Sequence, residues 1–377
     1  MQEAAAQART AARIANIAVR AAVHEAAATR KPGLVCADSR GAHDDMDFAT
    51  LLAGALSLRP YFTDAAALGF RTAHAEAKDA FPQLRNLGRT AEAAMYKATG
   101  GVNTHKGLIF SLGLFCAAAG RTACQTAGRT NDKANDLTAR QPDSWPDSQP
   151  DSWPANQADS RPDRQTAKQP DSQPMNQTTA WDAALLSATA GSYLPGLCGN
   201  DFAPLRDGAA VSRVKAFAAD PGVNHAALWE HARAELAPLL GRTPSAGEIL
   251  YVCFDETGVR GEAEAGFPHV PPACEALRAW LETEDFNDAL INTLLLLMRD
   301  VRDTNILRRG GREGLSLVMR SAREALDLGG MREQKGRDAV AALADACAQK
   351  RLSPGGSADL LCLALFVILG ERDAAAR

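Results

Sequence analysis

The chain has 377 residues, with 41 Lys or Arg against 45 Asp or Glu, so its formal net charge is −4. This balance lacks the overall positive charge typical of nucleic-acid-binding domains, so any polyanionic ligand must be held by a local cluster of cations. Aromatic residues make up only 6% of the chain and alanine is abundant. Such a composition favours helices over a β-sandwich or barrel, and we predict an all-α protein that binds no nucleic acid.

The lengths of the apolar segments and the pattern of cysteines indicate the cellular location. The longest purely apolar stretch, 360–369, is too short to cross a bilayer, and the Ala-rich N-terminus fits an amphipathic helix better than a signal peptide. The cysteines form no C-x-x-C pair and most lie in apolar helical patterns, which indicates buried reduced thiols. We predict a cytoplasmic protein that does not contact a membrane, with a mitochondrial presequence as the alternative.

The first predicted helices lie in the N-terminal third of the chain. Apolar residues at helical spacing predict a helix over Phe48–Leu56, which Pro60 should end. A second set predicts a helix over Leu108–Ala119, which Gly120 should close.

One segment, 131–177, differs from its flanks. The unit Pro-Asp-Ser recurs there at Pro142, Pro146, Pro150 and Pro170, and large apolar residues are sparse. Such a polar, Pro-rich sequence cannot bury enough surface to offset the entropy of ordering it. We predict a disordered insertion within a single helical catalytic domain that spans 1–377.

The C-terminal half contains further helical patterns. Asp288–Ile306 is predicted to be one long helix, and Ala358–Leu369, apolar nearly all round, a buried central helix. Ile249–Phe254 fits either a short strand or a helical turn. Together these segments predict a compact bundle of many helices.

Pairs of glycines punctuate the predicted helices at Gly100-Gly101, Gly310-Gly311 and Gly355-Gly356. Glycine lets the backbone approach a ligand closely, and a helix that starts directly afterwards offers free N–H groups to a phosphate. Lys106 would add a positive charge in such a first turn. The alternative is that these glycines are helix C-caps and tight turns.

Two acidic clusters could carry chemistry. In the run from His43 to Asp47, Asp45 and Asp47 could hold a divalent cation, and an Asp or His43 could act as a general base. N-capping of the following helix is the structural alternative. In the second cluster, Arg260 is followed by Glu262 and Glu264, for which solvated loop charges are the alternative.

Together these segments resemble the triphosphoribosyl-dephospho-CoA synthase family. The similarity rests on motifs that occur in the family's order, namely Lys31-Pro-Gly-Leu-Val35, Gly41-Ala-His43 with Asp45-Met-Asp47, Gly101-Val-Asn-Thr-His-Lys-Gly107, Arg260-Gly-Glu-Ala263, Gly266-Phe-Pro268, Asp303-Thr-Asn305 and Leu352–Leu361. Two positions depart from the family pattern, because Cys36 stands where an Asp is usual and Arg40 where an Asn is usual.

The resemblance implies an all-helical enzyme with a specific reaction. The family joins the 5-triphosphoribosyl group of ATP to the ribose 2′-hydroxyl of 3′-dephospho-CoA and releases adenine. The product is the prosthetic-group precursor for the acyl carrier protein of citrate lyase or malonate decarboxylase, to which a separate transferase passes it. The alternatives are another pentosyl transferase that uses ATP and a non-catalytic helical protein that binds CoA or nucleotides.

The resemblance also implies roles for individual residues. Among the catalytic candidates, His43, His105 or Glu262 would move protons and Asp303 would orient a ribose, while Mg²⁺ on the triphosphate would be held by Asp45 and Asp47. The substrate-binding candidates are Lys31, Gly101, Asn103, Thr104, Lys106, Arg260, Asn305, Gly355, Gly356 and Ser357.

Overall fold

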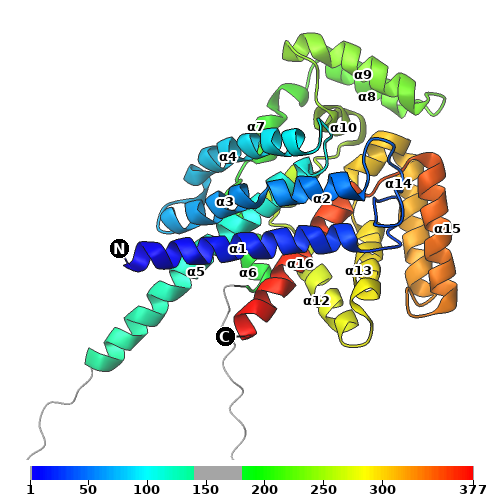
Figure 1. Ribbon diagram of the computed structural model, residues 1–377. Coiled ribbons are helices and arrows are strands. Elements are labelled where there is room, and N and C mark those ends of the chain that lie inside the picture. The colour runs from blue at the N-terminus through cyan, green and yellow to red at the C-terminus, as the bar shows by residue number, and fades with distance from the viewer. Residues whose placement is uncertain (1, 140–180, 377) are drawn as a thin grey trace, which may run out of the picture.

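The computed structural model describes residues 2–139 and 181–376. These residues form helices and connecting turns, without a strand in either described range, so the all-α prediction is confirmed (Figure 1). The helices are α1 (Gln2–Ala27), α2 (Phe48–Ser57), α3 (Arg59–Arg71), α4 (Ala77–Ala98), α5 (Lys106–Ala139), α6 (Ala183–Gly191), α7 (Leu197–Asp201), the short 3-10 helix η1 (Ala203–Leu205), α8 (Ala209–Ala219), α9 (His225–Leu240), α10 (Ala246–Phe254), α11 (Val259–Glu264), α12 (Val270–Leu281), α13 (Phe286–Asp300), α14 (Thr304–Asp327), α15 (Gln334–Lys350) and α16 (Gly355–Ala375).

The core forms where α1, α3, α5 and α16 pack against one another. The closest approach is between α3 and α5, where a Cβ on Gly69 would lie 2.0 Å from Ala117 O and one on Gly120 2.1 Å from Ala66 O. The prediction that Gly120 closes this helix was therefore wrong. Glycine is needed there because two backbones meet, and α5 continues past it to Ala139.

The apolar part of α5 belongs to this core. Over Lys106–Thr126 the helix is long and apolar enough to cross a membrane, but most of that stretch is buried inside the protein. Its C-terminal end, residues 131–139, is helical and overlaps the start of the predicted insertion. Residues 140–177 of that insertion lie outside the described residues.

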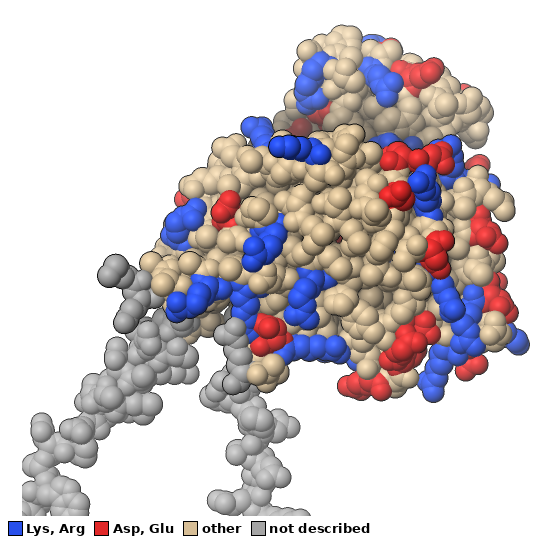
Figure 2. Space-filling model, in the orientation of Figure 1, with Lys and Arg blue, Asp and Glu red and all other residues tan. Residues whose placement is uncertain are grey.

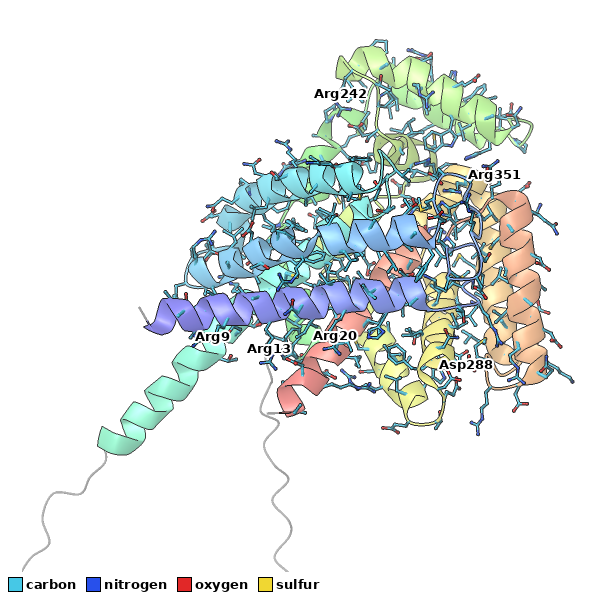
Figure 3. All side chains as sticks on the ribbon, in the orientation of Figure 1. Arg9, Arg13, Arg20, Arg242, Asp288 and Arg351 are labelled. Atoms are coloured by element: carbon cyan, nitrogen blue, oxygen red, sulfur yellow. The ribbon has the colours of Figure 1, made fainter. Side chains whose placement is uncertain are left out.

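α1 shows how an Ala-rich sequence with scattered arginines joins the core. Its small apolar face contacts α3 and α16, while Arg9 and Arg20 are exposed and Arg13 pairs with Asp373 at the other end of the chain. Figure 2 shows basic side chains over this part of the surface, and Figure 3 identifies the three arginines along α1.

Two other predicted helices differ in their ends. Pro60 does not simply end the first helix; it lies in the first turn of α3, where a missing backbone N–H costs nothing. The predicted helix Asp288–Ile306 was wrong as one element, because the chain leaves helical geometry at Val301 and starts again as α14 after Asp303. Ile249–Phe254 is helical and belongs to α10, and the buried central helix is confirmed as α16.

The segments that carry the motifs meet at one end of this core. α1 ends and α5, α14 and α16 begin around a common cavity, and α4, α10 and α11 contribute to its wall. The hairpin of α8 and α9 projects from the body at the top of Figure 1. The loop between α1 and α2 crosses to the α14–α15 side, where its Asp44 pairs with Arg351, labelled in Figure 3.

Candidate active site

A cavity of about 1290 Å³ gathers most of the residues predicted from the sequence. It is lined by Lys31, His43, Asp45, Asn103, Thr104, His105, Lys106, Arg260, Glu262, Asp303, Asn305, Gly355 and Gly356. Asp47, Gly101 and Ser357 are not part of its lining. Motifs from both halves of the chain therefore share one site, although each was singled out separately along the sequence.

Three long helices begin at this cavity, namely α5, α14 and α16. Both α14 and α5 approach the start of α16, since a Cβ on Gly355 would fall 2.8 Å from Asn305 Nδ2 of α14 and one on Gly107 of α5 would fall 2.0 Å from Asp359 Oδ2. The first amides of a helix have no partner within the helix, and the helix dipole adds partial positive charge at this end. The arrangement suits a polyanionic ligand with many phosphate oxygens.

Asp303 joins two of these helix ends. Its Oδ1 accepts hydrogen bonds from the backbone N–H groups of Asn305 at 2.8 Å and Ile306 at 3.4 Å, so it caps α14. Its Oδ2 accepts from the N–H of Ser357 at 2.8 Å and from the Ser357 hydroxyl at 3.1 Å. Burial raises the pKa of Asp303, while these donors oppose the rise. Both oxygens are occupied by protein donors, so Asp303 acts by positioning α14 against α16.

A buried ion pair lies at the floor of the cavity. Lys31 Nζ donates to Glu25 Oε1 at 2.7 Å and to the Glu25 carbonyl at 2.6 Å, and the Lys31 side chain is fully buried. Glu25 is in the last turn of α1, so this pair fixes the loop after α1 to the helix. Lys31 lines the cavity, but its charge is already matched.

His105 lies in the same part of the cavity and is 5% exposed. Its Nδ1 is 2.9 Å from the Thr104 hydroxyl, and its Nε2 is buried without a hydrogen-bond partner among the described residues. Burial, and then the charge of Lys31, lower the pKa of His105 to about 4. The imidazole is therefore neutral at physiological pH.

The two aspartates predicted as metal ligands have different surroundings. Asp45 lines the cavity with 63% of its side chain exposed, and its Oδ1 is 3.3 Å from Nδ1 of His43. Asp47 caps α2, accepting from the backbone N–H of Thr50 at 2.9 Å, and its other oxygen accepts from Arg40 at 3.2 Å. Asp47 thus has the capping role that was the alternative reading. Within the described ranges no group of three or more His, Cys, Asp or Glu side chains could hold a metal ion.

His43 is held by both ring nitrogens. Nε2 is 2.8 Å from the Ser353 hydroxyl, which belongs to the loop before α16, and Nδ1 faces Asp45. Burial, followed by the charge of Arg309, lowers the pKa of His43. The contacts indicate that His43 ties the loop before α2 to the loop before α16.

Glu262 forms a dyad with His269, a residue that the sequence analysis missed. Glu262 Oε2 is 2.8 Å from His269 Nδ1, and Oε1 accepts from the His269 backbone N–H at 3.2 Å. Both residues line the cavity, and the hydrogen bond from His269 to the Glu262 carboxylate raises the pKa of His269. A carboxylate on Nδ1 fixes the tautomer and leaves Nε2 able to accept a proton. The available signal was the position of His269 directly after Gly266-Phe267-Pro268.

The cations of the cavity rim differ in whether they have a carboxylate partner. Lys106 Nζ lies 3.0 Å from Glu92, Arg260 Nε lies 2.9 Å from Asp201, and Arg302 pairs with Glu256. Arg89 and Arg308 also line the cavity, are exposed, and have no carboxylate partner within the described residues. These two were not assigned from the sequence, although Arg308 belongs to the basic pair beside Gly310.

Asp359 is a further cavity residue that was not assigned from the sequence. It lines the cavity from the second turn of α16. The signal was present, since Asp359 is the only charged side chain between Gly355 and Gly370 in a helix predicted to be buried.

The Gly100-Gly101 pair and Cys36 also lie outside the cavity lining. Gly100 and Gly101 have φ of 66° and 93°, and the Gly101 N–H donates to Tyr96 O at 2.8 Å, so this pair ends α4. Cys36, which replaces the Asp usual in the family, is buried outside the cavity lining, with its thiol 3.5 Å from Leu34 O. Burial raises the pKa of this thiol.

The motifs at this cavity agree with a comparison of the whole sequence. The profile of the ATP:dephospho-CoA triphosphoribosyl transferase family matches residues 11–182 and 179–377. The chain belongs to this family.

Curated relatives in this family match most of the chain. One, named 2-(5''-triphosphoribosyl)-3'-dephosphocoenzyme-A synthase, from Escherichia fergusonii, is 30% identical over 94% of this chain and 89% of its own length. A probable synthase of the same name from Citrobacter koseri is 32% identical over 94% of this chain and 89% of its own length. Protein CitXG from Haemophilus influenzae is 29% identical over 92% of this chain and 58% of its own. No solved structure matches the chain.

Proposed function

We propose that the protein transfers the 5-triphosphoribosyl group of ATP to the ribose 2′-hydroxyl of 3′-dephospho-CoA, with release of adenine. The observation that carries this proposal is the family match over nearly the whole chain, together with the gathering of its motifs at one cavity. The reaction displaces a nitrogen base from an anomeric carbon, and such displacements pass through an oxocarbenium-like transition state.

The cavity suits two nucleotide-like substrates. Its volume of about 1290 Å³ exceeds the roughly 300–1,000 Å³ typical of sites for one small ligand. The rim cations can neutralise the triphosphate of ATP and the pyrophosphate of dephospho-CoA, with the dipoles of α5, α14 and α16 adding positive potential. The amides of Asn305, Ile306 and Ser357 do not contribute hydrogen bonds, because they already donate to Asp303. Arg308 and Arg89 are available at once, whereas Lys106 and Arg260 must exchange a carboxylate for a phosphate.

The other cavity residues would transfer protons and orient the substrates. The His269–Glu262 dyad takes the proton from the attacking 2′-hydroxyl at Nε2, and Glu262 stabilises the imidazolium that forms. Asp303 holds the helix ends in place, and Asn305 beside it is free to orient a ribose. His105 remains neutral and can offer Nε2 to a substrate hydroxyl or base nitrogen.

The proposal includes a Mg²⁺ ion bound to the triphosphate, for which the cavity offers one protein ligand from the predicted pair. Mg²⁺ is usually held by one or two carboxylates and substrate phosphates, with water filling the other positions. Asp45 lies on the cavity wall with an exposed carboxylate, whereas the oxygens of Asp47 are used by the α2 cap and Arg40. Asp45 would hold the ion, which would supply charge neutralisation on the triphosphate.

The product then serves as the prosthetic-group precursor for the acyl carrier protein of citrate lyase or malonate decarboxylase, through a separate transferase. The site would work on soluble nucleotides in the cytoplasm. The burial of the apolar part of α5 in the core agrees with this location.

The test is chromatography of adenine released from ATP, with and without dephospho-CoA, in the presence of Mg²⁺. We expect one adenine per dephospho-CoA consumed, and no adenine when the acceptor is left out. Equal release without dephospho-CoA would assign a different pentosyl transfer, and binding of both ligands with no adenine release would assign a non-catalytic role.

A further inference from the structure

Asp359 is an acidic residue of the cavity wall whose carboxyl group has no hydrogen-bond or ion-pair partner among the described residues. It lies in the second turn of α16, surrounded in sequence by Ala358, Leu360 and Leu361, and it lines the cavity. No hydrogen bond or ion pair joins it to the described part of the chain. Asp303, the N-cap of α14, differs in this respect, because both of its oxygens accept hydrogen bonds from protein donors.

The neighbouring helix is shaped to receive this carboxyl group. Asp359 Oδ2 lies so close to Gly107, in the first turn of α5, that a Cβ built there would be only 2.0 Å from it. The absence of a side chain at Gly107 therefore lets the carboxyl group rest against the backbone of α5. Gly107 is in helical conformation, so its conformational freedom does not explain this glycine, and the contact with Asp359 does.

The charges around Asp359 favour its protonated form. Burial raises its pKa well above the usual range, and the carboxylates of Glu25 from α1 and Asp303 from α14 act in the same direction. Lys31 is bound to Glu25 by a hydrogen bond and ion pair, and His105 from α5 is neutral. A carboxyl group kept neutral in this way can donate a proton inside a binding site.

We propose that Asp359 is the general acid that protonates the adenine as it leaves C1′ of ATP. This inference rests on the proposed function. The bond between C1′ and the adenine nitrogen breaks with its electron pair going to adenine, which takes the Asp359 proton. The 2′-hydroxyl oxygen forms the new bond to C1′ and its proton goes to His269. Water then returns a proton from His269 to Asp359, so no further reactant is required.

The role can be separated from a structural one by changing the leaving group. An acid catalyst matters only when the leaving group needs a proton, so 4-nitrophenyl riboside 5-triphosphate, which releases nitrophenolate, should bypass it. With ATP, Asp359→Asn should lower kcat by about 10²- to 10⁴-fold, the range for general acid catalysis. With the nitrophenyl substrate the same variant should stay within about tenfold of the unchanged protein.

Asp345→Asn on α15 is the matched control, because Asp345 is exposed and lies outside the cavity lining. It should leave both reactions unchanged. Equal loss with ATP and with the nitrophenyl substrate in Asp359→Asn would overturn the assignment, and so would full activity of that variant with ATP.

Gly107→Ala provides a second test that leaves the carboxyl group present. The new methyl group must displace Asp359, so kcat with ATP should fall while the reaction of the nitrophenyl substrate is largely kept. Unchanged turnover of ATP would contradict the inference. The proposed function is tested separately, because the unchanged protein must first release adenine from ATP and dephospho-CoA; if it does not, the proposed function has failed before Asp359 is considered.

Discussion

The floor and the rim of the cavity use charged side chains in different ways. On the floor, Lys31 and Glu25 are paired out of water and Asp303 is occupied by donors from two helices. On the rim, Lys106 and Arg260 are paired with carboxylates but remain partly exposed. The floor groups are fixed by folding and can define the geometry of the reaction, whereas rim cations can exchange their partners for phosphates when substrate arrives.

The largest effect should follow from breaking the floor. Lys31→Met would leave Glu25 buried without its cation, and we expect the free energy of unfolding to fall by about 3–5 kcal/mol, the usual cost of removing one partner of a buried ion pair. Urea denaturation followed by circular dichroism measures this. The double variant Glu25→Gln, Lys31→Met should lose less free energy of unfolding than Lys31→Met alone, because it leaves no unpaired buried charge. A larger loss in the double variant would contradict the conclusion that Lys31 serves to neutralise Glu25.

A second floor prediction concerns pH. The pKa of His105 is about 4 in the folded protein and about 6.5 when unfolded, so between these values the unfolded state binds the additional proton. Stability should therefore decrease as the pH falls from about 6.5 to 4, by up to roughly 1.4 kcal/mol per pH unit from this group. Denaturation curves of wild type and His105→Gln at several pH values isolate the contribution. Identical pH dependence in the two proteins would show that His105 is not held neutral.

Most helices and motifs could be predicted from the sequence, whereas the tertiary contacts between them could not. Apolar periodicity placed α2 and a continuous apolar run placed α16, and both signals are local in the sequence. The break between α13 and α14 was missed because the contacts of Asp303 that fix it, with the first amides of α14 and with the distant Ser357, do not follow from the spacing of apolar residues. Gly120 was misread for the same reason, since its role is the close contact with Ala66 of α3.

The site shows the same limit. Gly-rich and acidic motifs could be named from the sequence, but their neighbours could not. Lys106 and Arg260 have carboxylate partners contributed by α4 and α7. Arg89 and Arg308 became candidates only when the fold brought α4 and α14 to one cavity. Partner choice depends on tertiary distance, which residue spacing does not contain.

On the rim, the largest loss should come from a cation without a partner. Arg308→Ala removes a charge that has no carboxylate partner in the described ranges, and a charge-assisted hydrogen bond contributes about 1.5–3 kcal/mol. Nucleotide binding should weaken by about ten- to a hundredfold, with little change in melting temperature. Calorimetric titration of ATP and, separately, of dephospho-CoA measures this and shows which ligand Arg308 holds. Unchanged affinity for both would remove Arg308 from the site.

Lys106→Ala should have the smallest effect of these changes. Lys106 must break its ion pair with Glu92 before it can bind a phosphate. The cost of breaking that pair reduces the net contribution of Lys106 to ATP binding. We expect ATP binding to weaken by less than about tenfold, which corresponds to under about 1.4 kcal/mol. Glu92→Gln, which frees the lysine, should strengthen ATP binding. A loss for Lys106→Ala that exceeds the loss for Arg308→Ala would reverse the proposed order of rim cations.

The central claim is that the reaction occurs at C1′ of the ATP ribose. The most direct measurement is mass spectrometry of the products formed from ATP carrying ¹³C at C1′, dephospho-CoA and Mg²⁺. The account predicts that dephospho-CoA gains a labelled triphosphoribosyl group and that unlabelled adenine appears in equal amount. Transfer of labelled adenylate to dephospho-CoA with release of pyrophosphate would place the reaction at the α-phosphate and contradict the account.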